Sequence, residues 1–421
     1  MIEQYVRQLG QLWKSNPLFT VISVLATALT IAFVMILYMV YSFRTKDIAP
    51  EGNRSRVLYS GTGYSYLTKD HSQANGGMSF KAAEAIFGDL ENAETVSYCM
   101  AKGEGAAYVG LSSSNSEKKI VSLVDDNYFR IFQFDFISGQ PFTNEQAEAS
   151  RREAIITDRV ALQFYNSTDV TGKNININFY DYRITGVVRS FSSLFNQAYS
   201  DVWIVADKQS MDWAPGRSEG LLGNCQAIVL AKKNVSLNTL KAEIDNHMER
   251  LNENLREFTF EQDMVTHAQS NFFGNNTSNP AKIFAALICV LLVVPAINMS
   301  GLLASQMKKR REEIGIRKAY GANNQQISNQ LLFENFSLTL IGGLIGFVLS
   351  FIVITVFKNM LLSDLTTINA GDAFSLPLSL FFHPGIFIAV FAFCLVINLL
   401  SAVIPVWNVA RATIIETMKG E

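Results

Sequence analysis

The 421-residue sequence has little charge. Asp, Glu, Lys and Arg make up 17% of the residues, whereas soluble domains average about 25%. The 35 basic and 37 acidic residues nearly cancel, so the chain lacks the excess of positive charge that binding to a nucleic acid requires. Because 49% of the residues are hydrophobic, we expect a membrane protein with no nucleic-acid partner.

Motifs for catalysis and metal binding are also absent. The sequence contains no G-x-x-x-x-G-K-[ST] loop for a nucleotide phosphate, no H-E-x-x-H pair and no G-x-S-x-G turn. Its four histidines are scattered, and we interpret them as ordinary core or surface residues. The sequence therefore predicts a subunit without catalytic residues that itself binds no metal and no cofactor.

Only four cysteines occur. Cys289 and Cys394 lie in apolar runs, where a thiol usually packs as a small group. Cys99 and Cys225 lie in a segment of soluble composition, and an oxidising compartment would permit a bridge between them. Sequence separation does not define the distance between two Cβ atoms, so this disulfide stays open.

Four apolar runs are long enough to cross a bilayer, which takes about 20 helical residues. They cover residues 18–43, 283–303, 336–357 and 385–406. The first run exceeds the apolar core of a secretory signal and leads to no small-residue cleavage site, so we expect a retained anchor. The predicted fold class is an integral membrane α-helical protein with four transmembrane helices and an inserted mixed α+β extracytoplasmic domain at residues 44–280.

Lys and Arg near the ends of these runs predict the orientation, because cytoplasmic loops are enriched in them. Ten lie on one side and four on the other. This bias places both termini, residues 304–335 and the tail at residues 407–421 in the cytoplasm, and residues 44–280 and 358–384 outside. Residues 1–17 form an apolar helical face, which favours an interfacial helix on membrane lipid over one that binds a partner.

Residues 44–280 alternate β-rich runs with helical stretches, which predicts a packed α+β domain. Side-chain oxygens that satisfy unpaired helix amides predict helix starts at Ser79, Asp158 and Ser236. The expected strands cover residues 56–59, 95–100, 107–111, 120–124, 154–156, 175–179, 182–188, 202–205 and 227–230.

The most informative stretch is the predicted cytoplasmic loop MKKRREEIGIRKAYGA. Helical spacing pairs Glu313 with Arg317, and Gly321 is suited to end that helix with a positive φ. Asn324 is expected to cap the next helix. Gly315 would let a second surface approach the backbone. The alternative is a basic loop that only sets membrane topology, and composition does not separate these two interpretations.

This stretch also carries a family resemblance. The segment KKRREEIGIRKAYGANNQQISNQLLFENFSLTLIGGLIGFVLS closely resembles the FtsX-type permease pattern of a basic loop, an acid-bearing helix and a Gly-rich span. The C-terminal IPVWNVARATIIETMKG is similar to the ending of that family, with Ile415 where Pro is usual. The segments VDDNYFRIFQFDFISGQPF, AIITDRVALQFYNSTDVTGKNI and YRITGVV resemble MacB-like extracytoplasmic domains. The chain thus resembles ABC transporter permeases of the MacB/FtsX superfamily.

The resemblance implies a mechanism called mechanotransmission. Two permease chains pair as a homodimer or heterodimer, a cytoplasmic ABC ATPase binds ATP and Mg²⁺, and ATP-driven closure moves the external domains to export or extract a substrate. The ATPase is expected in a separate chain because MacB carries its own ATPase domain, which this sequence lacks. The implied ATPase-coupling residues are Glu312, Glu313, Ile314, Gly315, Ile316, Arg317, Lys318 and Gly321.

Gly342 and Gly346 form a G-x-x-x-G face suited to close helix packing. Glu334 lies near the cytoplasmic end of the third apolar run, and we expect it at the membrane interface rather than in the bundle interior.

The implied location is the bacterial inner membrane, with the large domain in the periplasm. A periplasmic adaptor or an extracytoplasmic substrate protein is a further expected partner. Two alternatives remain: an FtsX-like regulator of an extracytoplasmic hydrolase, and a membrane-anchored sensor or receptor, which should carry a cytoplasmic signalling domain. The sequence does not identify the substrate, because a fold does not fix a function.

Overall fold

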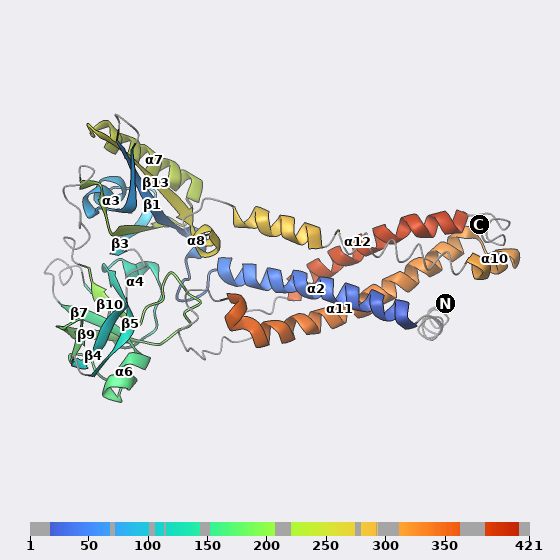
Figure 1. Ribbon diagram of the computed structural model, residues 1–421, viewed down its shortest axis with the longest axis horizontal. Helices are drawn as coiled ribbons and strands as arrows, with labels where there is room; N and C mark the ends of the chain where they lie inside the picture. The colour runs from blue at the N-terminus through green and yellow to red at the C-terminus, as the bar shows by residue number, and fades with distance from the viewer. Residues whose placement is uncertain are drawn as a thin grey trace. The chain divides into compact units, whose positions relative to one another are not determined.

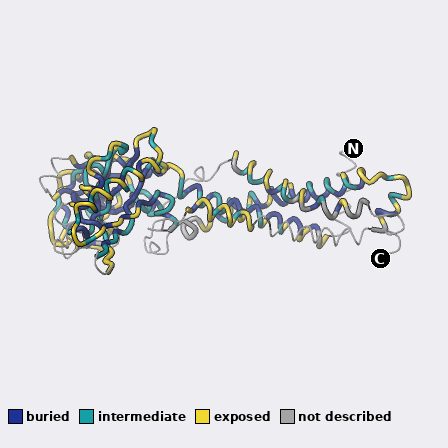
Figure 2. The backbone as a smooth tube through the Cα atoms, turned by 90° about the horizontal axis from the view of Figure 1, so that it is seen from above, coloured by how far each residue is buried: buried dark blue, intermediate teal, exposed yellow. Residues whose placement is uncertain are grey.

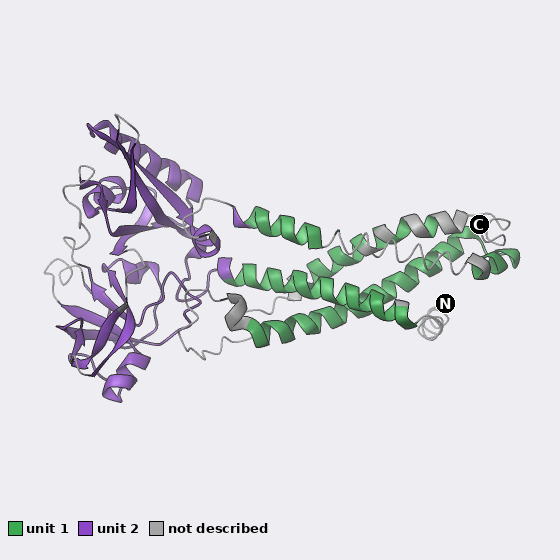
Figure 3. Ribbon diagram, viewed as in Figure 1, with its two compact units in different colours: residues 1–43, 281–362, 377–421 green, residues 44–280, 363–376 purple. Residues whose placement is uncertain are grey.

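The computed structural model describes residues 17–67, 72–100, 106–112, 115–143, 152–206, 220–273, 279–291, 293, 311–362 and 384–411. The chain divides into two compact units (Figure 3). The helical unit comprises residues 1–43, 281–362 and 377–421, and the sheet unit comprises residues 44–280 and 363–376. The predicted interfacial helix before Pro17, the second apolar run after residue 293 and the tail after Arg411 lie outside the described residues.

The helical unit is built from the apolar runs of the sequence. Its helices are α2 (Pro17–Thr45), α10 (Arg311–Ala319), α11 (Asn324–Leu362) and α12 (Pro384–Arg411). Within the described residues, Thr20–Thr45 and Asn324–Phe357 are long and apolar enough to cross a membrane, and shorter apolar helices cover Pro280–Leu291 and Phe387–Ile397. The described residues thus contain two long candidate spans, whereas the sequence predicts four in the whole chain.

The exposed face of α2 is apolar. Leu18, Val21, Leu25 and Leu29 recur every three or four residues and are exposed, whereas Ala28 on the other face is buried. Figure 2 shows the same mixture of buried and exposed residues along the other helices. A continuous exposed apolar stripe is unfavourable in water, so this pattern fits a helix surrounded by lipid.

The glycines of α11 lie where this helix contacts its neighbours. A Cβ added to Gly346 would lie 2.4 Å from the carbonyl oxygen of Ala28 on α2, and Gly342 also faces α2. A Cβ on Gly343 would lie 2.0 Å from the Phe391 ring on α12. Each glycine therefore lets α11 approach closer than any other residue would allow.

Figure 1 shows the strands and helices of the sheet unit. In chain order they are η1 (Arg54–Arg56), β1 (Val57–Leu67), β2 (Gln73–Met78), α3 (Phe80–Phe87), β3 (Ala93–Met100), β4 (Ala106–Ser112), β5 (Asn115–Val124), α4 (Tyr128–Ile131), β6 (Phe136–Gly139), β7 (Glu153–Thr157), α6 (Asp158–Tyr165), β8 (Asn174–Ile177), β9 (Tyr180–Val188), β10 (Val202–Val205), β11 (Leu222–Gly223), β12 (Cys225–Ala231), α7 (Leu237–Glu253), β13 (Phe258–Thr266) and α8 (His267–Phe273).

Among the described residues these strands form one thirteen-stranded sheet in the order β10-β7-β9-β8-β4-β5-β3-β12-β1-β2-β11, with β6 joined to β9 and β13 joined to β1. Because β10 pairs with both β7 and β5, six of the strands close into a ring. Each ring strand contributes to one buried cluster that includes Val109, Val121, Ile156, Ile175, Ile184 and Ile204.

A second core lies where α3 and α7 pack on the other strands. Ile86 and Phe87 of α3 meet Leu240 and Ile244 of α7 in one buried cluster. The α+β domain predicted for residues 44–280 is present as this sheet unit. The strands β2, β6, β11 and β13 were not predicted.

Two of the three helix caps predicted for residues 44–280 are confirmed. The hydroxyl of Ser79 accepts a hydrogen bond from the Ala82 amide, and Ser236 caps α7 in the same way. The prediction for Asp158 is wrong by one residue, because the Thr157 hydroxyl caps α6. The Asp158 carboxylate instead accepts hydrogen bonds from the amide and hydroxyl of Ser190.

Cys99 and Cys225 lie on the adjacent strands β3 and β12. They are not opposite each other, because Cys99 pairs with Gln226 and Cys225 pairs with Met100. Both are buried thiols and form no disulfide.

A buried polar cluster joins the start of the sheet unit to α8. Glu51 Oε2 lies 2.7 Å from Arg54 Nη2 and 3.3 Å from His267 Nε2, and all three side chains are about 1% exposed. Glu51 Oε1 accepts hydrogen bonds from the amides of residues 197 and 198, and Tyr59 Oη lies 3.0 Å from His267 Nδ1. His267 Nε2 also lies 2.6 Å from Asn271 Nδ2, so the imidazole contacts Glu51, Tyr59 and Asn271 within this cluster.

Charge and burial act against each other in this cluster. Burial by itself would raise the pKa of Glu51, but the charge of His267 when protonated, the charge of Arg54 and the hydrogen bonds that Glu51 accepts lower it to about 2. Burial lowers the pKa of His267 below its usual 6.5. The scattered histidine of the sequence is therefore a core residue, as predicted, with a buried carboxylate as its neighbour.

Candidate functional site

The predicted coupling segment forms a helical hairpin. Its first helix, α10, ends at Gly321, whose φ is +93°. The Gly321 amide donates to the Lys318 carbonyl at 2.9 Å and the Ala322 amide donates to the Arg317 carbonyl at 3.0 Å, which satisfies carbonyls that the helix end leaves unpaired. Nothing lies within 4 Å of a Cβ added at Gly321, so the backbone conformation rather than space requires glycine here.

The second helix begins with a reciprocal cap. The Asn323 side chain accepts a hydrogen bond from the Gln325 amide at 2.6 Å, and the Gln326 side chain accepts one from the Asn323 amide at 3.1 Å. The capping residue is therefore Asn323 and not Asn324, which is the first residue of α11. From there α11 runs for 39 residues into the apolar span.

One face of α10 is anchored inside the helical unit. Ile314 is buried against Ile327 and Leu331 of α11 and against Ala402 and Val406 of α12. Gly315 is also buried. Ile314 and Gly315 thus face the chain's own helices and hold α10 in place.

A row of polar contacts connects α10 with α11. Glu313 and Arg317 form an i,i+4 ion pair, and the Arg317 guanidinium also donates to Gln330 Oε1 at 2.7 Å. Gln330 in turn donates to Glu334 Oε1 at 3.2 Å. Glu334 is only 7% exposed, so it faces the helix bundle, and the expectation that it lies at the interface is wrong. A buried acid is acceptable here because Gln330 donates to it.

The opposite face of α10 carries two exposed hydrophobic side chains. Ile316 is 56% exposed and Tyr320 is 89% exposed, and their spacing of four residues places them on the same side of the helix. The ion pair of Glu313 and Arg317 is also partly exposed. This exposed apolar face with adjacent charges, anchored from behind by Ile314, has the composition of a protein-docking surface.

The structure distributes the predicted coupling residues over both faces. Glu313 and Ile316 are exposed, Arg317 and Lys318 are partly exposed, and the Glu312 side chain lies outside the described residues. Tyr320 and Gln330 were missed as candidates. The spacing of Tyr320 from Ile316 was a readable signal, whereas the contact of Gln330 depends on how two helices fold together.

Sequence comparisons identify the class of protein. The MacB-like periplasmic core domain matches residues 20–247, more than half of the chain, and the FtsX-like permease C-terminal domain matches residues 284–414. The chain therefore belongs to the family with a MacB-like periplasmic core domain, and its C-terminal part matches an FtsX-like permease domain. Neither matched domain is an ATPase domain.

Individual relatives agree with this class. The uncharacterized ABC transporter permease YknZ of Bacillus subtilis is 25% identical over 252 residues, which cover 58% of this chain and 61% of the relative. A macrolide export ATP-binding/permease protein MacB of Shewanella oneidensis is 25% identical over 323 residues, 72% of this chain and 43% of the relative. The chain thus spans less than two thirds of the length of these relatives.

Among solved structures, the periplasmic region of MacB from Actinobacillus actinomycetemcomitans aligns with a TM-score of 0.38 at 12% identity. The alignment covers 54% of this chain and 96% of that structure.

Proposed function

We propose that this permease couples ATP hydrolysis by a separate cytoplasmic ATPase to movement of its extracytoplasmic domain, for export or extraction of a substrate. In this proposal α10 is the docking helix. The observation that carries it is the pair of exposed hydrophobic side chains, Ile316 and Tyr320, on a short helix whose opposite face is anchored by Ile314.

The exposed pair supplies a reason for a partner to bind. Burying one large apolar side chain contributes about 1.5–3 kcal/mol, and Tyr is among the residues that dominate binding at interfaces. The partly exposed Glu313 and Arg317 lie on the same helix and would orient the partner by charge rather than by apolar area.

The anchored face supplies a route for movement. A push on α10 would act on α11 through the packing of Ile314 and through the contacts from Arg317 to Gln330 and from Gln330 to Glu334. Because α11 continues unbroken from Asn324 into the span, a displacement at its start would move the whole helix.

The remaining partners follow from the same proposal. ATP and Mg²⁺ would bind to the ATPase subunit, a second permease chain would complete the transporter, and lipid would cover the exposed apolar stripes of α2 and α11. The multi-pass topology, with both termini and α10 in the cytoplasm and the sheet unit outside, is part of this proposal.

Copurification tests the docking surface. The chain would be coexpressed with its cognate ABC ATPase. The permease chain would carry Ile316→Ser with Tyr320→Ser, Ile314→Ala, or the control Gln325→Ala at an exposed position of α11. We expect the double variant to lose ATPase binding and transport while its thermal stability stays unchanged. Ile314→Ala should lower stability as well, because it leaves a cavity in the anchor. Wild-type copurification by the double variant would refute the docking surface.

A further inference from the structure

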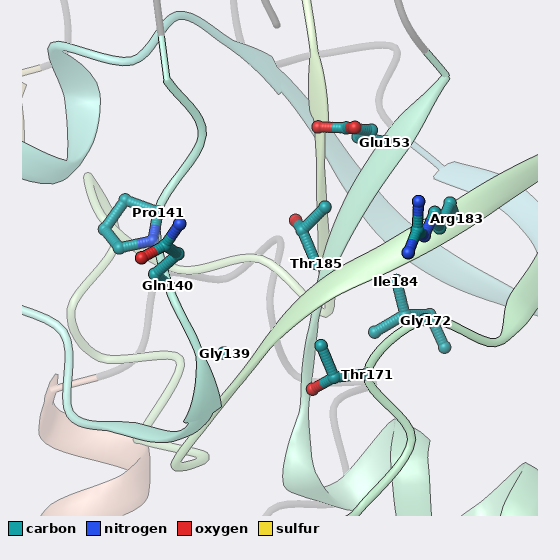
Figure 4. A pocket seen from close by; sticks show the side chains of 9 residues that line it. All are labelled: Gly139, Gln140, Pro141, Glu153, Thr171, Gly172, Arg183, Ile184 and Thr185. Atoms are coloured by element: carbon teal, nitrogen blue, oxygen red, sulfur yellow. The ribbon is translucent and has the colours of Figure 1, made fainter.

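A cavity of about 400 Å³ lies in the sheet unit between β6, β7, β9 and the loop before β8. It is lined by Glu153 of β7 and Arg183 and Thr185 of β9, and across from them by Gln140, Pro141 and Thr171. Figure 4 shows the Glu153 carboxyl group and Thr185 between Gln140 and Pro141 on one side and Arg183 on the other. Its volume is within the range of small-molecule sites.

The carboxylate in this cavity is unusual. Glu153 is 5% exposed, and its Oε2 is a buried atom that receives no hydrogen bond from the part of the chain that the structure describes. Buried polar atoms in proteins nearly always have a partner, because leaving one unsatisfied costs the full desolvation of that group. The Glu51 carboxylate, equally buried, accepts hydrogen bonds at both oxygens.

The cavity also contains the opposite charge. Glu153 and Arg183 are paired residues of the parallel strands β7 and β9, so both side chains point to the same face of the sheet. Among the described residues no ion pair joins them, and no other carboxylate pairs with Arg183. The hydroxyls of Thr171 and Thr185 donate or accept within the wall, to Ser138 and Ala154, and keep free acceptor positions.

The wall of the cavity is fixed by a close backbone contact. Gly139, at the end of β6, has a φ of +73°, and a Cβ there would lie 2.0 Å from the Thr185 carbonyl oxygen. The Gln140 amide donates to that same carbonyl at 3.3 Å. The cavity is therefore preformed by the strand pairing rather than by side-chain packing alone.

We propose that this cavity binds a small zwitterion with a primary ammonium group close to an anionic group. The ammonium would donate to the Glu153 carboxylate and to a threonine hydroxyl, and the anionic group would accept from the Arg183 guanidinium. Adjacent strands lie about 4.8 Å apart, so one small molecule spans both charges. Peptide termini and phosphoethanolamine headgroups share this chemistry. The inference goes beyond the proposed coupling function and does not depend on it.

Thermal unfolding of the detergent-solubilised full chain, followed by tryptophan fluorescence, tests the proposal. The probes are glycylglycine and phosphoethanolamine, with N-acetylglycine lacking the ammonium and ethanolamine lacking the anion. We expect a concentration-dependent rise in melting temperature with one or both zwitterions and not with the two incomplete molecules. The zwitterion with the larger rise identifies the source.

Variants complete the test. Glu153→Gln and Arg183→Gln should each weaken binding about tenfold or more, because each removes a charge-assisted hydrogen bond. Glu117→Gln, an exposed carboxylate outside the cavity, is the matched control. Should neither zwitterion raise the melting temperature of the wild type, or should Glu153→Gln respond like Glu117→Gln, the site is only a water-filled cavity. Equal effects of ethanolamine and the zwitterions would overturn the assignment to Arg183.

Discussion

The buried Glu51 cluster allows a comparison of two ion pairs with the same contact distance. Glu51 lies 2.7 Å from Arg54 with both side chains 1% exposed, and Asp135 lies 2.7 Å from Arg189 with both more than 60% exposed. The two pairs differ in burial, and Glu51 in addition accepts hydrogen bonds from two backbone amides. Burial and these extra contacts together decide what the loss of the carboxylate costs.

Glu51→Gln keeps the side-chain size but removes the charge beside a buried guanidinium. Breaking a buried pair at one partner costs about 3–5 kcal/mol, because the remaining charge stays desolvated. Glu51 also accepts from the amides of residues 197 and 198, and an amide side chain cannot accept at both ends. We expect a loss at the upper end of that range, a large part of the stability of a typical domain.

Chemical unfolding of the full chain in detergent measures this loss. Trp203 is fully buried in the sheet unit and clusters with Tyr59, so fluorescence reports on the affected core. The control Asp135→Asn should change stability very little, since exposed pairs are screened by water. If Glu51→Gln lost no more stability than Asp135→Asn, the account of this cluster as a buried, mutually dependent ion pair would be wrong.

Three further predictions concern the same units. The free energy of unfolding should fall as the pH drops below 6.5, because the buried His267 must then become charged in the folded chain. It should fall again between pH 4.5 and about 2, where protonation of Glu51 removes about 3 kcal/mol of stabilisation. In an unfolding profile measured against pH, Glu51→Gln should flatten this second part. Gly346→Leu should weaken packing of α11 on α2 by about 1–3 kcal/mol and lower the melting temperature of the helical unit, whereas an unchanged temperature would contradict the close approach to Ala28. Phe179→Gly should stabilise the sheet unit by up to about 1 kcal/mol in chemical unfolding. Phe179 is 81% exposed in the β8–β9 turn and has a φ of +72°, a backbone conformation that is strained for Phe and not for Gly. A loss of stability would contradict this account of backbone strain.

The sequence predicted the parts of the fold that depend on local pattern. Long apolar runs became α2 and α11, and runs rich in Val and Ile became central strands such as β7, β10 and β12, which are almost entirely buried. The alternation of Phe258, Phe260 and Met264 was a readable signal for β13 that was missed. By contrast β2, with the sequence QANGGM, has no strand propensity and forms because it pairs with β1 and β11.

The sites were less predictable, because their residues meet only after folding. Glu51 and His267 are 216 positions apart, and although Arg54 lies three residues from Glu51, nothing local in the sequence indicates that this pair is buried or that His267 joins it. Glu153 and Arg183 become neighbours only through the parallel register of β7 and β9. The coupling segment was more accessible to prediction, since the spacing of Glu313 from Arg317 and the φ of Gly321 are local features.

The glycines of α11 bear on how a movement of α10 would travel. Three glycines within five residues would make an isolated helix easy to bend, and a bend there would absorb a displacement at the cytoplasmic end. In the folded chain, however, Gly342 and Gly346 lie against the α2 backbone and Gly343 lies against Phe391, so the same glycines are fixed by packing on two sides. The helix spans about 58 Å at 1.5 Å per residue over its 39 residues, with no described break. We therefore expect α11 to move as one rigid element together with α2, so that the proposed coupling acts through helix displacement and not through a hinge.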